Sequence, residues 1–107
     1  MHTENFARLC RQTRDELLAV YSEGTTTEVS RLLQSAALDP EQTNLVRRAL
    51  ESAMTDTFYT VLLALDGAAS LGGIQQTYTL KDEHGNLICA GDGSLEAAAW
   101  EVFHSEQ

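Results

Sequence analysis

Histidines are the side chains best suited to move protons near neutral pH, and this chain has His2, His84 and His104. His2 and His104 lie near the two ends of the chain, and His84 lies in a predicted turn. None is placed where a rigid element would present it to a nucleophile, and neither a G-x-S-x-G nor a Walker A sequence occurs. We therefore expect three solvated imidazoles and a protein that is not an enzyme.

Metal chemistry is the next possibility, because acidic and amide side chains gather in residues 82–86 (DEHGN). A calcium loop needs oxygen ligands at alternating positions up to a final glutamate, whereas Leu87, Ile88 and Cys89 follow here. Cys10 and Cys89 have no C-x-x-C spacing that would build a zinc site. We expect no metal, no cofactor and two buried thiols, which would form a bridge only in oxidised protein.

Paired carboxylates are a third option, since Asp56 and Asp66 border a hydrophobic segment. Ten residues of helix separate them by about 15 Å, which is too far for a cooperating acid–base pair. Asp66 and Gly67 instead predict a helix end at which the carboxylate accepts amides of the following loop, with a role facing a partner as the alternative. Residues 91–94 (GDGS) lack the lysine of a phosphate loop and predict a turn and a helix cap.

Three helices are predicted before residue 66. Apolar residues at three- and four-residue steps predict one over residues 3–22 and a shorter one from 26 or 27 to 37. Asp39 as a cap and Pro40 at the first helical position then begin a third, which runs to about residue 65. Its length of nearly 40 Å makes it the spine of the domain.

The spine becomes apolar almost all round from Thr57 onwards, which predicts that its second half is covered on every side. The cover must come from the C-terminal third, where residues 77–81 and 87–90 predict a β-hairpin with Tyr78 and Leu80 on one face. Ser94 would cap a last helix with Trp100 beside its buried stripe. The stripe consists of Leu95, Ala98, Ala99, Val102 and Phe103. We expect a single α+β domain over residues 1–107, mainly helical, with three N-terminal helices, a two-stranded antiparallel hairpin and a C-terminal helix.

The charge of −9 is distributed unevenly. Residues 1–39 carry four arginines and six acids, residues 40–70 two arginines and four acids, and residues 71–107 one lysine and six acids, which gives −2, −2 and −5. Such a surface disfavours nucleic acid and anionic membranes and suits a basic protein. The residues expected to meet that partner are Asp82, Glu83, Asp92, Glu96, Tyr78 and Trp100. Without a signal peptide or a long apolar run, the expected location is the cytoplasm.

Residues 58–103 resemble small bacterial immunity proteins of toxin–immunity systems. The resemblance lies in residues 62–67 (LLALDG), a hydrophobic helix ending in an Asp-Gly pair, followed by residues 78–86 (YTLKDEHGN), a short hairpin. It implies a bacterial, cytoplasmic protein that binds and neutralises a cognate toxin.

The leading hypothesis is therefore a non-enzymatic acidic binding protein that neutralises a basic toxin domain. Two alternatives stay open. A small-molecule-sensing or accessory domain would use a cavity between spine and hairpin lined by Tyr59, Leu63 and Tyr78. A structural homodimer would bury the hairpin edge and exposed apolar residues.

Overall fold

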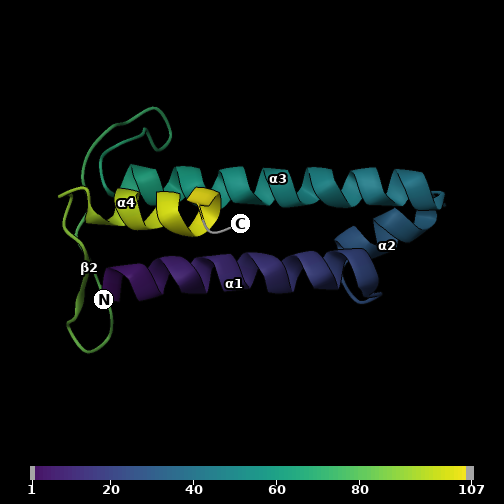
Figure 1. Cartoon of the computed structure of the whole chain (residues 1–107), viewed down its shortest axis with the longest axis horizontal. Helices are drawn as coiled ribbons and strands as arrows, with labels where there is room; N and C mark the ends of the chain where they lie inside the picture. The colour runs from purple at the N-terminus through teal and green to yellow at the C-terminus, as the bar shows by residue number, and fades with distance from the viewer. Residues whose placement is uncertain (1, 106–107) are drawn as a thin grey trace.

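The computed structural model describes residues 2–105 and is mainly helical, with an antiparallel hairpin and a C-terminal helix, as the sequence predicts (Figure 1). Its elements are α1 (His2–Glu23), α2 (Glu28–Ser35), α3 (Pro40–Leu65), β1 (Leu80–Lys81), β2 (Leu87–Cys89), α4 (Ser94–Trp100) and a π-helical turn (Glu101–Ser105). The second helix and both strands are shorter than expected.

The two long helices, α1 and α3, run antiparallel along the long axis of the molecule (Figure 1). At one end α4 packs against both of them, and at the other end α2 connects them. The principal extents are 46 × 30 × 25 Å and the radius of gyration is 16.1 Å, whereas about 13 Å is typical of a domain of this length. The shape is therefore elongated, because the short helix α4 cannot fill the whole space between the long helices α1 and α3.

The starts of α2 and α3 are set by local capping. Asp39 accepts a hydrogen bond from the Gln42 amide at 2.8 Å, and the Gln42 side chain accepts one from the Asp39 amide at 3.1 Å. Pro40 occupies the first turn, where its missing N–H costs no helical hydrogen bond. Thr27 and Ser30 form the same reciprocal cap at the start of α2. These signals are local, which is why the sequence reveals them.

The core lies at the end of the molecule that α4 covers. α4 and the π-turn contribute most of its buried side chains, which meet Ala7 of α1, Leu62 of α3 and Cys89 of β2. The buried residues from this C-terminal segment are Leu95, Ala98, Ala99, Val102 and Phe103. Phe58 of α3 stacks on Phe103 with ring centroids 6.3 Å apart. The predicted buried stripe of the last helix is therefore confirmed.

The expectation that the second half of α3 is covered on every side is wrong. Val61 is 41% exposed, and Thr57 and Thr60 are exposed as well. One short helix and α1 cover only one side of α3, so an apolar residue on the opposite side stays in contact with solvent. The first half of α3 is exposed for the same reason, and Leu45 is 56% exposed.

The hairpin packs at the start of α1. β1 pairs with β2 in an antiparallel register, Leu80 opposite Cys89 and Lys81 opposite Leu87, with an irregularity between the two pairs. The Thr3 hydroxyl of α1 donates to the Ile88 carbonyl at 2.7 Å. Tyr78 lies outside the strands, and its amide donates to the Leu65 carbonyl at the end of α3 at 3.0 Å.

The start of α4 differs from the expectation that Ser94 caps it. Gly93 is the cap residue, with φ +89°, and its position supplies no side-chain hydrogen bond. Two of the amides at this helix start donate to a carboxylate from a distant part of the chain, which the next subsection describes. Among the described residues, no helix is both long and apolar enough to cross a membrane.

Candidate functional site

Asp82 and Asp92, two of the predicted partner-binding acids, stabilise turns by accepting hydrogen bonds from nearby backbone amides. Asp82 accepts the amides of His84 and Asn86, each at 2.9 Å, and the Asn86 side chain at 3.0 Å. These hydrogen bonds, above all the one from the Asn86 side chain, lower the pKa of Asp82. Asp92 accepts the Ser94 amide at 3.0 Å, which lowers its pKa in the same way. Both carboxylates therefore have a structural role in addition to their charge.

The pKa shift of Asp82 makes a testable prediction for the hairpin turn. Because the folded pKa is lowered, the carboxylate stabilises the turn above its unfolded pKa of about 3.9, and this contribution disappears as the pH falls through the lower, folded value. An NMR titration of the His84 and Asn86 amides should give a midpoint below about 3.9. Asn86→Ala should raise that midpoint, and equal midpoints in the two proteins would show that the Asn86 side chain does not cause the shift.

The predicted acidic residues fall into two groups in space. Asp82 and Glu83 lie in the turn of the hairpin, whereas Asp92 and Glu96 lie at the start of α4. In Figure 1 the hairpin turn and α4 lie on opposite sides of α1. Glu83 comes within 3.6 Å of His84, and both side chains are exposed, so the contact contributes little. The sequence predicted one acidic surface that contains all four residues. In the fold, the hairpin turn and the start of α4 form two separate acidic groups.

Trp100 and Glu96 share the solvent-facing side of α4. Trp100 is 55% exposed, and both Glu96 and Glu101 are exposed beside it. The ring centroids of Trp100 and His104 are 4.9 Å apart. His104 also packs edge to face against Tyr59 of α3, with ring centroids 4.5 Å apart. His104 is thus half-buried between two aromatic rings, and the expectation of a solvated imidazole is wrong at this position.

Asp66 holds α4 in place. It is buried, and its carboxylate accepts the Gly93 amide at 3.2 Å and the Glu96 amide at 2.8 Å, the free N–H groups at the start of α4. The thiol of Cys89 donates to the same carboxylate at 3.7 Å. The sequence predicted that Asp66 would bind amides of the loop that follows it, but the amides belong to a helix about 30 residues away. Gly67, with φ +82°, then turns the chain away from α3.

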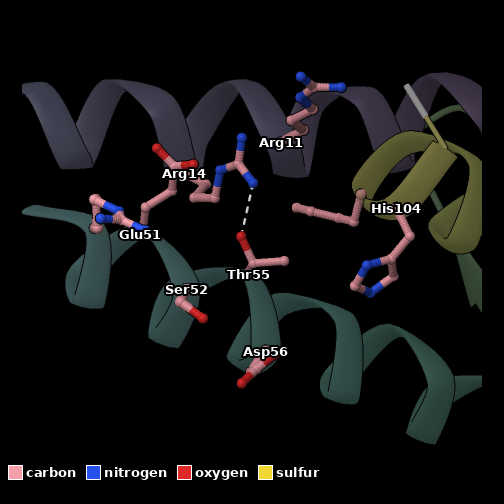
Figure 2. Close-up of a pocket in the computed structure, with 9 residues that line it drawn as sticks. Arg11, Arg14, Glu51, Ser52, Thr55, Asp56 and His104 are labelled. Atoms are coloured by element: carbon pink, nitrogen blue, oxygen red, sulfur yellow. Dashed lines mark hydrogen bonds between the residues drawn. The ribbon is translucent and has the colours of Figure 1, made fainter. Parts of the chain in front are cut away.

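A groove lies between α1 and α3 beyond the end of the π-turn (Figure 2). Its volume is about 400 Å³. α1 contributes Arg11 and Arg14, and α3 contributes Arg48, Glu51, Ser52, Thr55 and Asp56. Phe103 and His104 line it as well. Three of the seven Lys and Arg residues of a strongly acidic chain therefore line one groove.

Arg14 is the most constrained residue of this groove. Its side chain is only 10% exposed. It donates to the Thr55 hydroxyl across the groove at 2.7 Å, as Figure 2 shows, and to one carboxylate oxygen of Asp15 at 2.7 and 3.0 Å. Its guanidinium also lies 5.6 Å from the centre of the Phe103 ring, a cation–π distance. Arg14 thus connects α1, α3 and the π-turn.

Sequence reasoning missed this groove. Arg11 and Arg14 are three residues apart, and Arg48, Ser52 and Thr55 follow steps of four and three, so each set shares one helix face. That spacing was the available signal, but polar residues on an amphipathic helix are usually solvated. Only the position of α4 shows that these faces oppose each other across a hollow.

The two cysteines differ in burial: Cys10 is half-buried and Cys89 is buried. Cys10 and Cys89 are free thiols, and burial raises the pKa of both. Within residues 2–105, no group of three or more His, Cys, Asp or Glu side chains is arranged to hold a metal ion. The expected cavity between spine and hairpin involves Tyr59 and Tyr78, but Tyr59 packs on His104 while the Tyr78 hydroxyl accepts from Gln76 at 3.0 Å.

Comparison with protein-family models, with curated proteins and with solved structures finds no match for this chain.

Proposed function

We propose that the protein is a non-enzymatic binding protein that neutralises a basic partner protein, in the manner of a bacterial immunity protein, through the exposed side of α4. The observation that carries this proposal is Trp100, which is 55% exposed although it is the only tryptophan of the chain. Its contact with His104 orients the ring without covering it. Exposed, pre-oriented tryptophans are typical of the residues that dominate protein–protein affinity.

The charge around Trp100 supports a basic partner. Glu96 lies on the same short helix and Glu101 begins the π-turn directly after Trp100, and the whole chain carries −9. Negative charge around an aromatic anchor accelerates association with a positive surface, while the anchor slows dissociation. The elongated shape supports binding too, because it leaves one side of each long helix uncovered.

The test begins with affinity capture from the native cell at low salt, followed by a binary affinity measurement with the retained protein. We expect that protein to be basic, and we expect Trp100→Ala to weaken the complex by about 30-fold or more, since tryptophan anchors contribute 2 kcal/mol or more. Leu45→Ala is the matched control: Leu45 is 56% exposed on the part of α3 that α4 does not reach, and its removal should leave the affinity unchanged.

Charge variants separate the two acidic groups. The double change Glu96→Gln and Glu101→Gln should slow association and flatten its salt dependence, whereas Glu83→Gln on the hairpin should not. Full affinity in Trp100→Ala would place the interface elsewhere. A retained protein that is acidic would contradict the proposal, and protection of a cell from the retained protein by co-expression would support neutralisation directly.

A further inference from the structure

We propose that the groove between α1 and α3 binds a small phosphorylated molecule that also carries hydroxyl groups, such as a sugar phosphate. This proposal does not depend on the function proposed above, although His104 both lines the groove and contacts Trp100. The site uses the arginines of α1 and α3, whereas the partner surface uses the outward side of α4.

Arg14 provides the fixed part of this site. A guanidinium has five N–H groups, and Thr55 and Asp15 receive three hydrogen bonds from them. One N–H on Nη1 and one on Nη2 therefore have no hydrogen-bond partner among the described residues. These two groups belong to the two terminal nitrogens of a nine-tenths buried side chain that lines the groove, so each can donate to an oxygen of a bound phosphate.

Arg48 lines the same groove from α3. It is exposed and forms no hydrogen bond or ion pair with the described residues, so it can turn towards an anion without breaking a contact. Arg11 is already positioned, because its Nη1 donates to the Val102 carbonyl at 2.9 Å. Three arginines outnumber the two acids Glu51 and Asp56 in the lining of the groove, which favours a bound anion.

The polar groups around the arginines favour a phosphate monoester over a plain carboxylate. A carboxylate offers two oxygens in one plane, which a single guanidinium fork satisfies. A phosphate offers three terminal oxygens in a tetrahedral arrangement, and the groove adds the Ser52 hydroxyl and a second arginine on the facing helix. Glu51 and Asp56, also in the lining, repel further negative charge but accept hydrogen bonds from ligand hydroxyls. The ligand should therefore carry one phosphate and several hydroxyls.

The experiment is an NMR titration of the full chain at constant ionic strength with four probes: glucose 6-phosphate, inorganic phosphate, glucose and succinate. Glucose 6-phosphate should give saturable shifts of the Thr55 and His104 amides. Inorganic phosphate should bind at the same amides but at least about threefold more weakly, and glucose and succinate should each be at least about tenfold weaker.

Two neighbouring arginines supply the variants. Arg48→Gln should weaken glucose 6-phosphate binding by about tenfold, the equivalent of one exposed charge-assisted hydrogen bond. Arg47→Gln makes the same charge change one residue away, at a side chain that lies outside the groove, and should stay within about twofold of the unmodified chain. Neither side chain is buried, so both variants should fold.

Three results would overturn the proposal: shifts that do not saturate by about 10 mM glucose 6-phosphate, equal affinity for succinate, or equal losses in the two arginine variants. The last would reveal a response to net charge instead of a site. None of these results bears on Trp100 or on the partner protein, so the two proposals fail independently.

Discussion

Asp66→Ala should lower the free energy of unfolding by about 3 to 4 kcal/mol. The carboxylate accepts two amides at the start of α4 and is itself buried. Alanine would leave both amides without a partner, because the cap residue Gly93 has no side chain and Asp92 accepts only the Ser94 amide. Hydrogen bonds to a charged acceptor are the stronger class in proteins, and a partly buried amide that loses its partner adds a desolvation cost.

The measurement is urea denaturation, with hydrogen exchange to locate the effect. Amides of Ala98 and Ala99 in α4 should exchange faster, because that helix loses its anchor to α3. Asp56→Ala is the matched control on the same helix: Asp56 is exposed, and its loss should change stability by less than about 0.5 kcal/mol. A loss below about 1 kcal/mol in Asp66→Ala would show that α4 is held by its apolar contacts alone.

Gly67→Ala should be the second most destabilising change, with a loss of about 2 to 4 kcal/mol. Gly67 has φ +82°, and a Cβ there would lie 2.6 Å from Cγ2 of Thr77. The left-handed backbone costs an alanine about 1 to 2 kcal/mol, and the overlap with Thr77 forces a shift of the loop that returns over α3.

A double-mutant cycle separates these two causes. In a Thr77→Ala background Cγ2 is absent, so Gly67→Ala should cost only the backbone term of about 1 to 2 kcal/mol. Gly73→Ala is the control for that term, because Gly73 has φ +84° and an added Cβ meets nothing within 4 Å. If Gly67→Ala and Gly73→Ala are equally destabilising in the unmodified chain, Thr77 does not restrict this turn.

Local chemistry accounts for the parts of the fold that the sequence predicts well. Asp39, Pro40 and Gln42 begin α3 through contacts within four residues. The turn at residues 82–86 closes through Asp82 and Asn86, which are equally near in sequence. The stripe of the last helix is readable for the same reason, since residues three and four apart share a helix face.

Contacts between residues far apart in the sequence explain the parts of the structure that the sequence predicts poorly. Ser94 was expected to cap α4, but Asp66 does so from about 30 residues away. His104 was expected in solvent, but a π-turn after Trp100 places it between Tyr59 and Trp100. π-Helical turns are rare and short, and no strong residue signature marks them. Helical periodicity in the sequence therefore does not predict the side-chain directions that they set.

The amino-acid sequence by itself determined the long helices, the caps of α2 and α3 and the negative charge, because each depends on neighbours within one or two turns or on composition alone. The tertiary structure decided where that charge and the few arginines lie. A last helix only seven residues long packs between two helices of 22 and 26 residues, so it covers one end and leaves a groove beyond it. That mismatch of lengths leaves Arg11, Arg14 and Arg48 along an open groove, while Trp100 is exposed because it lies on the solvent-facing side of α4. This arrangement arises from packing between distant segments, so the periodicity of residues within one segment does not predict it.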